Sequence, residues 1–375
     1  PTEILAQQHF KTISQELKSL NIKIDILTGS KKSKARKILL EELKNGDINL
    51  LIGTHALLED TVEFSNLGFV VIDEQHRFGV AQRAKLWKKN KYPPHILVMT
   101  ATPIPRTLSM TLYGDLDVSV IDELPPGRKE IKTLWKSDSS RLNIIRFMHE
   151  QIKEGRQVYI VFPLIDESAK LDYKNLIEGF DSIVREFPLP DFQVSVVHGQ
   201  MKSADKEYEM QRFVEGKTDI LVATTVIEVG VNVPNASVMV IESAERFGLS
   251  QLHQLRGRVG RGANQSYCVL MSGHKVSADG KTRLQTMVDT NDGFKLAEVD
   301  LKLRGPGDMM GTKQSGLLNF KIADLIKDNK ILIYAREQAQ ILLEDDFDLS
   351  KSENINIARF YRPYARERMG WSRIS

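Results

Sequence analysis

The chain has no G-x-x-x-x-G-K-[ST] loop anywhere in its 375 residues, so it lacks the usual self-contained cradle for the β and γ phosphates of a nucleotide. It also has no apolar stretch near the roughly 20 residues that span a bilayer, and no secretory signal peptide. Neither sign of charge is in clear excess, because 52 Lys and Arg face 49 Asp and Glu. Local charge must therefore decide whether the partner is a polyanion.

Cysteine is nearly absent as well. The single one, Cys268, excludes an internal disulfide, which fits a reducing cytosol. It lies in the apolar run SYCVLMS and is predicted to be a small buried residue, because thiols are among the most buried side chains. The chain opens with Pro1 rather than Met, which predicts a processed or truncated chain.

Short apolar runs rich in β-branched residues alternate with longer helix-compatible segments, the pattern of α/β domains with parallel sheets. Most runs end in a small or polar residue, and ligands of open α/β sheets lie beyond the carboxyl ends of the strands. The expected strands are Ile22 to Gly29, Ile48 to Thr54, Phe69 to Glu74, Ile96 to Thr102, Val158 to Ile165, Phe192 to Gly199, Asp219 to Thr225, Ser237 to Ser243 and Ser266 to Ser272.

Two stretches of the chain match at a constant offset of 170 residues (199−29, 216−46 and 224−54). In order along the chain, each stretch is predicted to contain a strand, a glycine turn, a basic polar helix, a glycine that ends the helix, a buried strand and a threonine. One interpretation is that any two β-turn-α-turn-β units look alike, because glycine commonly ends helices. The other is two copies of one nucleotide-motor core, which would put Thr54 and Thr224 at equivalent strand tips.

Domain boundaries follow from where the pattern breaks. A linker is expected around Glu123 to Lys132, where ELPPGRKEIK contains two prolines and a glycine. Beyond Ser272 the alternation stops, and a third region has a glycine-rich segment, a helix from about Ile322 to Leu343 and a basic aromatic tail. The predicted domains are residues 1–125, 126–275 and 276–375.

Two acidic residues end the expected buried strand Phe69 to Glu74. Asp73 would hold Mg²⁺ through water, and Glu74 would polarise an attacking water. A DE pair after a strand can also simply start a loop or cap a helix. The continuation DEQH, through His76, and a TAT sequence about 25 residues later favour the catalytic interpretation.

The segment TATPIPRT places two hydroxyls, Thr100 and Thr102, at a strand end ahead of proline turns. Its simplest interpretation is a hydroxyl turn that closes the strand. At this distance after DEQH we expect the two threonines to relay the state of a phosphate site to a nucleic-acid track.

The stretch VATTVIEVGVNVPNA begins at Val222, and its Thr224 and Thr225 are expected to end a buried strand ahead of a loop shaped by Gly230 and Pro234. Uncharged hydroxyl and backbone N–H groups suit contacts to phosphodiesters that do not read sequence. A plain turn is the alternative.

The run HQLRGRVGRG is expected to begin as a helix and to fray at its glycines. It contains Gln254, Arg256, Arg258 and Arg261, and the three-residue spacing of the last two would put them on one helical face. Such arginines bind nucleic-acid phosphate in many proteins. The favoured role is that of arginine fingers, which neutralise the transition state of phosphoryl transfer.

In this order the motifs resemble those of superfamily 2 DNA helicases through almost the whole chain. The matching segments are PTEILAQQH at Pro1 to His9 (motif Ia), IGTHALL (Ib), DEQH (II), TATPIPRT (III), Val222 to Ala236 (V) and QLHQLRGRVGRG (VI). Within that superfamily, LPPGR at Leu124 and the run from Asp300 to Gly316 resemble the translocation motif shared by the RecG family and transcription-repair coupling factors. The tail to Ser375 fits the RecG family better.

The resemblance implies an α/β fold with two RecA-like parallel-sheet motor domains, the first incomplete at its amino terminus, and a small carboxyl-terminal helical or hairpin translocation region. It implies an ATP-dependent double-stranded DNA translocase that uses ATP and Mg²⁺ and remodels stalled replication forks and recombination intermediates. The expected protein is a monomer in the bacterial cytoplasm, associated with the nucleoid and not with a membrane. A single-stranded-DNA-binding protein is a further expected partner.

The roles implied for individual residues fall into four groups. These are catalysis (Asp73, Glu74, Gln254, Arg258 and Arg261), coupling to ATP (His76, Thr100, Thr102, Gly230 and Asn232), DNA binding (Thr54, His55, Thr224 and Thr225) and translocation (Arg283, Arg304 and Gln314). The chain departs from the family at Asn232, where motif V usually has an acidic residue, and in the missing phosphate-loop lysine and amino-terminal wedge domain. We therefore expect this chain alone to be inactive.

Two other functions stay open at this point. One is a non-catalytic DNA-binding module that lost its phosphate loop, which the intact DEQH and arginines argue against. The other is a transcription-repair coupling translocase, which would share every motor residue and carry an RNA-polymerase-binding domain.

Overall fold

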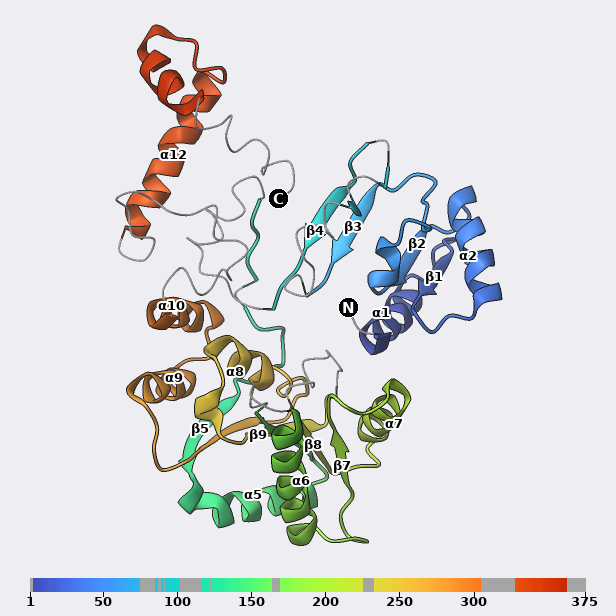
Figure 1. The fold of residues 1–375 in the computed structure, drawn as a ribbon, viewed down its shortest axis with the longest axis vertical. Coiled ribbons are helices and arrows are strands. Elements are labelled where there is room, and N and C mark those ends of the chain that lie inside the picture. Colours follow the sequence, from blue (N-terminus) through green and yellow to red (C-terminus); the bar gives the residue numbers. More distant parts are fainter. Residues whose placement is uncertain are drawn as a thin grey trace. The chain divides into compact units, whose positions relative to one another are not determined.

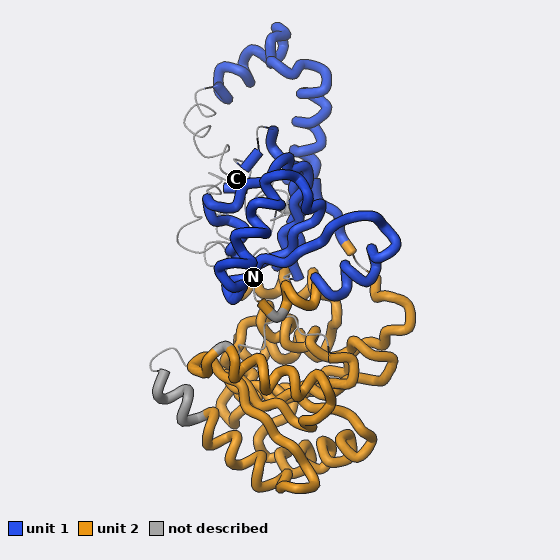
Figure 2. The backbone as a smooth tube through the Cα atoms, turned by 90° about the vertical axis from the view of Figure 1, so that its right-hand side faces the viewer, with its two compact units in different colours: residues 1, 10–120, 304–375 blue, residues 2–9, 121–303 orange. Residues whose placement is uncertain are grey.

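A computed structural model describes residues 3–74, 85–86, 89–90, 92–101, 117–121, 123–163, 169–224, 233–304 and 328–362. The chain divides into two compact units (Figure 2). Unit 1 comprises Pro1 and residues 10–120 and 304–375, and unit 2 comprises residues 2–9 and 121–303.

Unit 2 is built on a six-stranded sheet in which every paired strand is parallel (Figure 1). The strand order is β5-β10-β9-β6-β8-β7. The strands are β5 (Lys132–Ser137), β6 (Gln157–Phe162), β7 (Val194–Val197), β8 (Ile220–Thr224), β9 (Ala236–Ile241) and β10 (Tyr267–Ser272). All residues of β8 and β9 are buried, as parallel strands covered on both faces require.

Both faces of this sheet are packed, because alternate residues of each strand point to opposite sides. Val158 and Ile160 of β6 belong to one apolar cluster, whereas Tyr159 and Val161 belong to the other. The helices of the unit are α5 (Arg141–Lys153), α6 (Ala169–Glu186), α7 (Ser203–Val214), α8 (Leu249–Arg256), α9 (Ala278–Asp289) and α10 (Gly293–Arg304). Buried Cys268 lies in β10, as predicted, and burial raises the pKa of its thiol to about 12.

The sequence prediction missed one strand. β5 begins at Lys132, the last residue of the expected linker, and pairs in parallel with β10 along its whole length. The exposure of its residues alternates, with Lys132, Leu134 and Lys136 exposed and Thr133 buried, which suits an edge strand. The preceding prolines indicate an interruption of regular structure, and for that reason the prediction placed no strand directly after them.

Unit 1 contains smaller sheets among its described residues. β1 (Ile24–Leu27) pairs in parallel with β2 (Leu50–Gly53), and β3 (Phe69–Ile72) pairs in parallel with β4 (His95–Val98). The helices are α2 (Ser33–Asn45) and α12 (Asn329–Asp345), while α1 (Glu3–Glu16) crosses the boundary between the units along the chain. The expected helix from about Ile322 to Leu343 is confirmed from Asn329 onward, and the described helix continues to Asp345. Residues 305–327 lie outside the described part.

The expectation that the strand before DEQH is buried was wrong for half of its residues. Ile72 is buried, but Phe69 is 59% exposed and Val71 is 50% exposed. β3 has β4 as its strand partner in the described chain, and one face of this pair packs on a small cluster around Leu58, Ile72 and Leu86. A strand covered on one face shows the alternation seen here.

The internal repeat is confirmed in the structure. β1, α2 and β2 recur as β7, α7 and β8, and the strand registers are equivalent, because Ile24 pairs with Leu50 where Val194 pairs with Ile220. Gly46 and Gly216 both have a left-handed backbone, with φ of 86° and 72°, after the helix.

One hydrogen bond is also repeated at the offset of 170. The Lys23 N–H donates to the Asn49 side chain, and the Gln193 N–H donates to the Asp219 side chain, both at 2.8 Å. The two stretches are therefore copies of one unit in fine detail.

Candidate functional site

Asp73 and Glu74 follow directly on the carboxyl end of β3. Asp73 Oδ1 accepts the backbone N–H of Glu74 at 2.9 Å. Glu74 has a φ of 54°, in the left-handed region that a residue other than glycine adopts only at some cost. Such outliers cluster at functional sites, because the surrounding structure holds a side chain in a direction that an ordinary turn would not give it.

The tip of β4 lies beside these two carboxylates. The Met99 N–H donates to the Ile72 carbonyl at 2.8 Å, which continues the β3–β4 ladder to the ends of both strands. Thr100, in the next position, is exposed. The structure therefore brings Asp73, Glu74 and Thr100 to one edge of one small sheet. His76 and Thr102 lie outside the described residues.

The residues at this edge fit a magnesium ion held largely through water and phosphate oxygens. Mg²⁺ in nucleotide sites is bound by one or two carboxylates together with phosphates and waters. Asp73 supplies one partly exposed carboxylate at a strand tip. No group of three His, Cys, Asp or Glu side chains in the described part of the chain is arranged as a protein cage for a metal. Asp73 is thus the residue that would hold the ion.

The second set of predicted catalytic residues lies in unit 2, at the end of α8. Gln254 is a half-buried residue of α8, and the helix ends at Arg256 with Gly257 as its carboxyl cap. Arg258 and Arg261 follow in irregular backbone, so the prediction that they share a helical face was wrong. The helix stops two residues before Arg258, as expected for a glycine-rich run that cannot sustain it.

Arg258 and Arg261 nevertheless lie near the same buried side chain. Both exert a Coulombic effect on the hydroxyl of Tyr159 in β6. Burial raises the pKa of Tyr159 above its usual range, and the two positive charges act in the opposite direction. Arg258 is 6% exposed and Arg261 is half-buried. Two guanidinium groups near one side chain are equipped to stabilise negative charge on a ligand.

Gly262 ties this segment to the stretch assigned to motif V. A Cβ atom at this position would lie 2.6 Å from the carbonyl oxygen of Pro234, a distance that real Cβ contacts do not reach. Glycine is therefore required for the close approach of the two backbones. Gly230, Asn232 and Thr225 of motif V lie outside the described residues.

The two strand-tip threonines are equivalent in position but differ in exposure. Thr54 follows β2, is half-buried, and its N–H donates to the Leu27 carbonyl at 3.3 Å; His55 begins the short 3₁₀ helix after it. Thr224 ends β8 at 3% exposure, and its hydroxyl oxygen has no hydrogen-bond partner within the described part of the chain. Access of a ligand to Thr224 thus depends on the residues that cover it.

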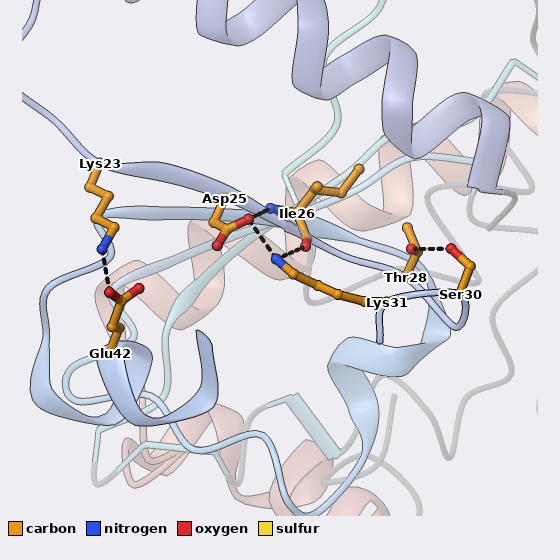
Figure 3. Close-up of polar contacts among 7 residues, drawn as sticks. All are labelled: Lys23, Asp25, Ile26, Thr28, Ser30, Lys31 and Glu42. Carbon is orange, nitrogen blue, oxygen red and sulfur yellow. Dashed lines mark hydrogen bonds and ion pairs between the residues drawn. The ribbon is translucent and has the colours of Figure 1, made fainter. Parts of the chain in front are cut away.

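Figure 3 shows how the loop between β1 and α2 is held at the first strand tip. Lys31 Nζ donates to Asp25 Oδ1 at 2.8 Å and to the Ile26 carbonyl at 2.9 Å. The Thr28 and Ser30 hydroxyls lie 3.1 Å apart. Sequence reasoning singled out Gly29 only as a repeat marker. The structure shows that Lys31 neutralises a carboxylate of its own strand, so its charge is already compensated.

The predicted translocation residues are partly described. Arg283, in α9, donates from Nη1 to the Phe247 carbonyl at 2.5 Å. Arg304 is the last residue of α10, and Gln314 lies outside the described residues. Asp300, a candidate ion-pair partner of Arg304, is 2% exposed and accepts a hydrogen bond from the Ser250 hydroxyl at 3.3 Å.

Three family models match the chain. They are described as DEAD/DEAH box helicase (residues 1–111), helicase conserved C-terminal domain (residues 141–263) and ATP-dependent DNA helicase RecG, domain 3, C-terminal (residues 290–375). Together with the parallel sheets, these matches confirm an α/β fold of RecA-like helicase domains followed by a RecG-type terminal region. The boundaries 1–125, 126–275 and 276–375 stay a prediction.

Similar proteins are named ATP-dependent DNA helicase RecG. The chain is 52% identical to the one from Synechocystis over 95% of this chain and 43% of that protein, and 51% identical to the one from Bacillus subtilis over 92% and 50%. The chain thus spans about half the length of the curated relatives it matches.

Solved structures agree with this relationship. A structure of RecG bound to a three-way DNA junction is 44% identical, with a TM-score of 0.70, over 88% of this chain and 42% of that one. The Mycobacterium smegmatis helicase Lhr is 17% identical with a TM-score of 0.55 over 76% of this chain and 41% of that one, and it supports the fold alone. No helix in the described part of the chain is long and apolar enough to cross a membrane.

Proposed function

The chain belongs to the RecG family of ATP-dependent DNA helicases, and on that premise we propose that it forms most of the motor of an ATP-driven translocase for branched double-stranded DNA. The observation that carries the proposal is that the chain holds both acidic and basic groups suited to a bound nucleotide. Unit 1 has a carboxylate pair at a strand tip, with Glu74 in a strained conformation, and unit 2 has two arginines beside Tyr159. Phosphoryl transfer needs both kinds of group.

The proposed chemistry assigns one role to each group. Bound Mg²⁺ would supply charge to the nucleotide phosphates, with Asp73 as its protein ligand. Glu74 orients the attacking water and accepts its proton. Arg258 and Arg261 neutralise the charge that develops on the transferred phosphoryl group, and Gln254 orients the same region. ATP is the proposed nucleotide because the relatives are named as ATP-dependent helicases.

The remaining predicted residues would couple this chemistry to DNA. Thr100, with His76, Thr102, Gly230 and Asn232, would report the state of the nucleotide. Thr54, His55, Thr224 and Thr225 would contact phosphodiesters through hydroxyl and backbone groups, and the repeated strand tips supply two equivalent contacts along a backbone. We further propose a monomer in the bacterial cytoplasm, associated with the nucleoid, with single-stranded-DNA-binding protein as a partner.

The first experiment compares this chain with a chain extended to the full length of the relatives, called the extended chain below. We expect phosphate release stimulated by branched DNA, and unwinding of a three-way junction, only from the extended chain. The 375 residues lack a phosphate loop, so the β and γ phosphates have no principal anchor. Turnover by this chain equal to that of the extended chain would contradict the missing-anchor argument. An extended chain that binds junctions without hydrolysing ATP would instead be a non-catalytic DNA-binding module.

A second prediction concerns Arg304. In the extended chain Arg304→Ala should keep at least half of the ATP turnover and lose most junction unwinding. ATP hydrolysis would then proceed without movement of the motor along the duplex. If Arg304 only forms a surface ion pair, worth about 0 to 1 kcal/mol, neither activity should change. Both activities are measured on one junction at one salt concentration, because phosphate contacts make affinity salt-dependent. Equal losses of both would mean that Arg304 serves folding or DNA binding.

A further inference from the structure

Arg256 is a buried cation whose charge is balanced by a helix end. It is the last residue of α8 and is 2% exposed. Its Nη1 atom donates to the carbonyls of Met287 at 2.8 Å and Thr290 at 2.9 Å, and to the Thr133 hydroxyl at 3.2 Å. No carboxylate in the described part of the chain forms an ion pair with it. The carbonyls belong to the carboxyl end of α9, where unsatisfied carbonyls and the helix dipole favour a positive charge.

The end of α9 depends on this contact from another helix. α9 has no basic residue in its own last turn. Arg256 therefore supplies from α8 the cation that helices often place in their own last turn. The second terminal nitrogen, Nη2, lies 3.0 Å from Nδ1 of His253. Burial and then the charge of Arg256 lower the pKa of His253 to about 4, while Asp292 acts in the opposite direction, so at neutral pH His253 is uncharged and Nδ1 can accept.

The opposite end of α8 is held by α9 as well. Arg283, one turn before Met287, donates to the carbonyl of Phe247, just ahead of α8. The Ser250 hydroxyl in the first turn of α8 donates to Asp300 of α10. Two arginines thus bond α8 and α9 to one another in opposite directions, and α10 joins them.

The segment that bears the finger arginines starts from this anchored point. The Arg258 N–H donates to the Leu255 carbonyl at 3.0 Å, and the Val259 N–H donates to the carbonyl of Arg256 at 3.2 Å. The turn that contains Arg258 is therefore hydrogen-bonded to Arg256, whose side chain bonds the carboxyl end of α9. A displacement of α9 relative to α8 cannot leave this turn unchanged.

We propose that Arg256 is a positioning residue that links the arginines of motif VI to the α9–α10 element. It would transmit the state of the phosphate site to the translocation residues on and after these helices. Arg256 itself would touch neither nucleotide nor DNA, because its side chain is buried and both Nη1 and Nη2 face protein acceptors. The proposal rests on the proposed ATP-driven function, and its first test is independent of that function.

The first test is amide hydrogen exchange in the extended chain. Arg256→Met fills much of the same space without donors. We expect it to lower protection at least tenfold both in residues 284–290 and in residues 257–260, because each segment loses the shared anchor. Arg256→Lys keeps the charge and a donor, and we expect it to restore much of the protection.

The matched control is Gln157→Met. Gln157 is 3% exposed, and its side-chain amide also donates to two backbone carbonyls, of Phe213 at 2.6 Å and of Thr218 at 2.8 Å. It lies at the start of β6, which β9 and β10 separate from β5 and its Thr133 in the sheet. The substitution should lower stability by a comparable amount and leave exchange in residues 257–260 and 284–290 unchanged relative to the rest of unit 2.

The second test is kinetic. Arg256→Met is expected to lower kcat for ATP about tenfold at an unchanged KM, and to lower the base pairs unwound per ATP about tenfold. Arg256→Lys should recover part of both, whereas Gln157→Met should change neither. A merely structural role would instead give equal losses in Arg256→Met and Gln157→Met.

The outcomes separate the two proposals. Unchanged exchange in either segment of Arg256→Met overturns the link whatever the DNA assays give. Altered exchange with normal kcat and normal unwinding per ATP also overturns it, since Arg256 would then only brace the fold. If the unsubstituted extended chain neither hydrolyses ATP nor unwinds junctions while exchange changes as expected, the mechanical link stands and the proposed function fails.

Discussion

Glu74→Gln in the extended chain is expected to lower DNA-stimulated ATP turnover by about 10²- to 10⁴-fold, the range that a positioned general base contributes. The amide keeps the size and shape of the side chain but cannot accept a proton from water. Glu74 follows β3 with a left-handed backbone, and its N–H is fixed by Asp73 Oδ1. The glutamine should occupy the same position, so ATP affinity should change by less than about threefold. Turnover is measured at saturating ATP, and affinity by titration with a labelled nucleotide.

Glu63→Gln is the matched control for this experiment. Glu63 is an exposed residue of the same unit, paired with Lys44 at 2.7 Å on the surface. Its loss should leave turnover unchanged, because exposed pairs contribute little. If Glu74→Gln keeps normal turnover at saturating ATP, Glu74 is not the base. If it loses ATP binding as well, Glu74 acts in binding the nucleotide or in folding.

Much of the fold was predictable because its signals are local. Buried parallel strands form apolar runs, and all nine expected strands begin or end within a few residues of observed ones for that reason. The repeat was predictable too, because Gly46 and Gly216 mark a backbone conformation that glycine adopts with ease. Insertion or deletion of one residue within either copy would have broken the constant offset.

Other features depend on contacts between distant parts of the chain. β5 is a strand because β10 offers it a partner 135 residues later, as with Lys132 and Tyr267, although four of its own six residues are polar. The exposure of Val71 follows from the number of neighbours that β3 has, which its sequence does not encode. The burial of Arg256 depends on carbonyls 31 and 34 residues away and on a hydroxyl 123 residues away. Spacing within QLRGRVGRG does not distinguish the three arginines, although the structure directs Nη1 and Nη2 of Arg256 at protein acceptors.

Arg261→Ala in the extended chain is expected to lower kcat for ATP by about 10³- to 10⁵-fold, the range measured for arginine fingers. Arg261 is the better of the two arginines to remove. It is half-buried, whereas Arg258 is 6% exposed and its loss would also disturb packing. An arginine that acts in the transition state alters kcat with little effect on KM.

The competing role for Arg261 is a contact to a DNA phosphate, and the two roles predict opposite patterns. A finger acts on hydrolysis whether or not DNA is bound, so DNA-free turnover should fall in Arg261→Ala and junction affinity should stay within about twofold. A phosphate contact would leave DNA-free turnover intact, weaken junction binding, and reduce the slope of log affinity against log salt by about 1. Arg146→Ala, on the exposed side of α5, is the control for loss of one surface charge. Loss of DNA-free turnover in Glu74→Gln alone would remove Arg261 from the catalytic residues and leave its segment as part of the DNA interface.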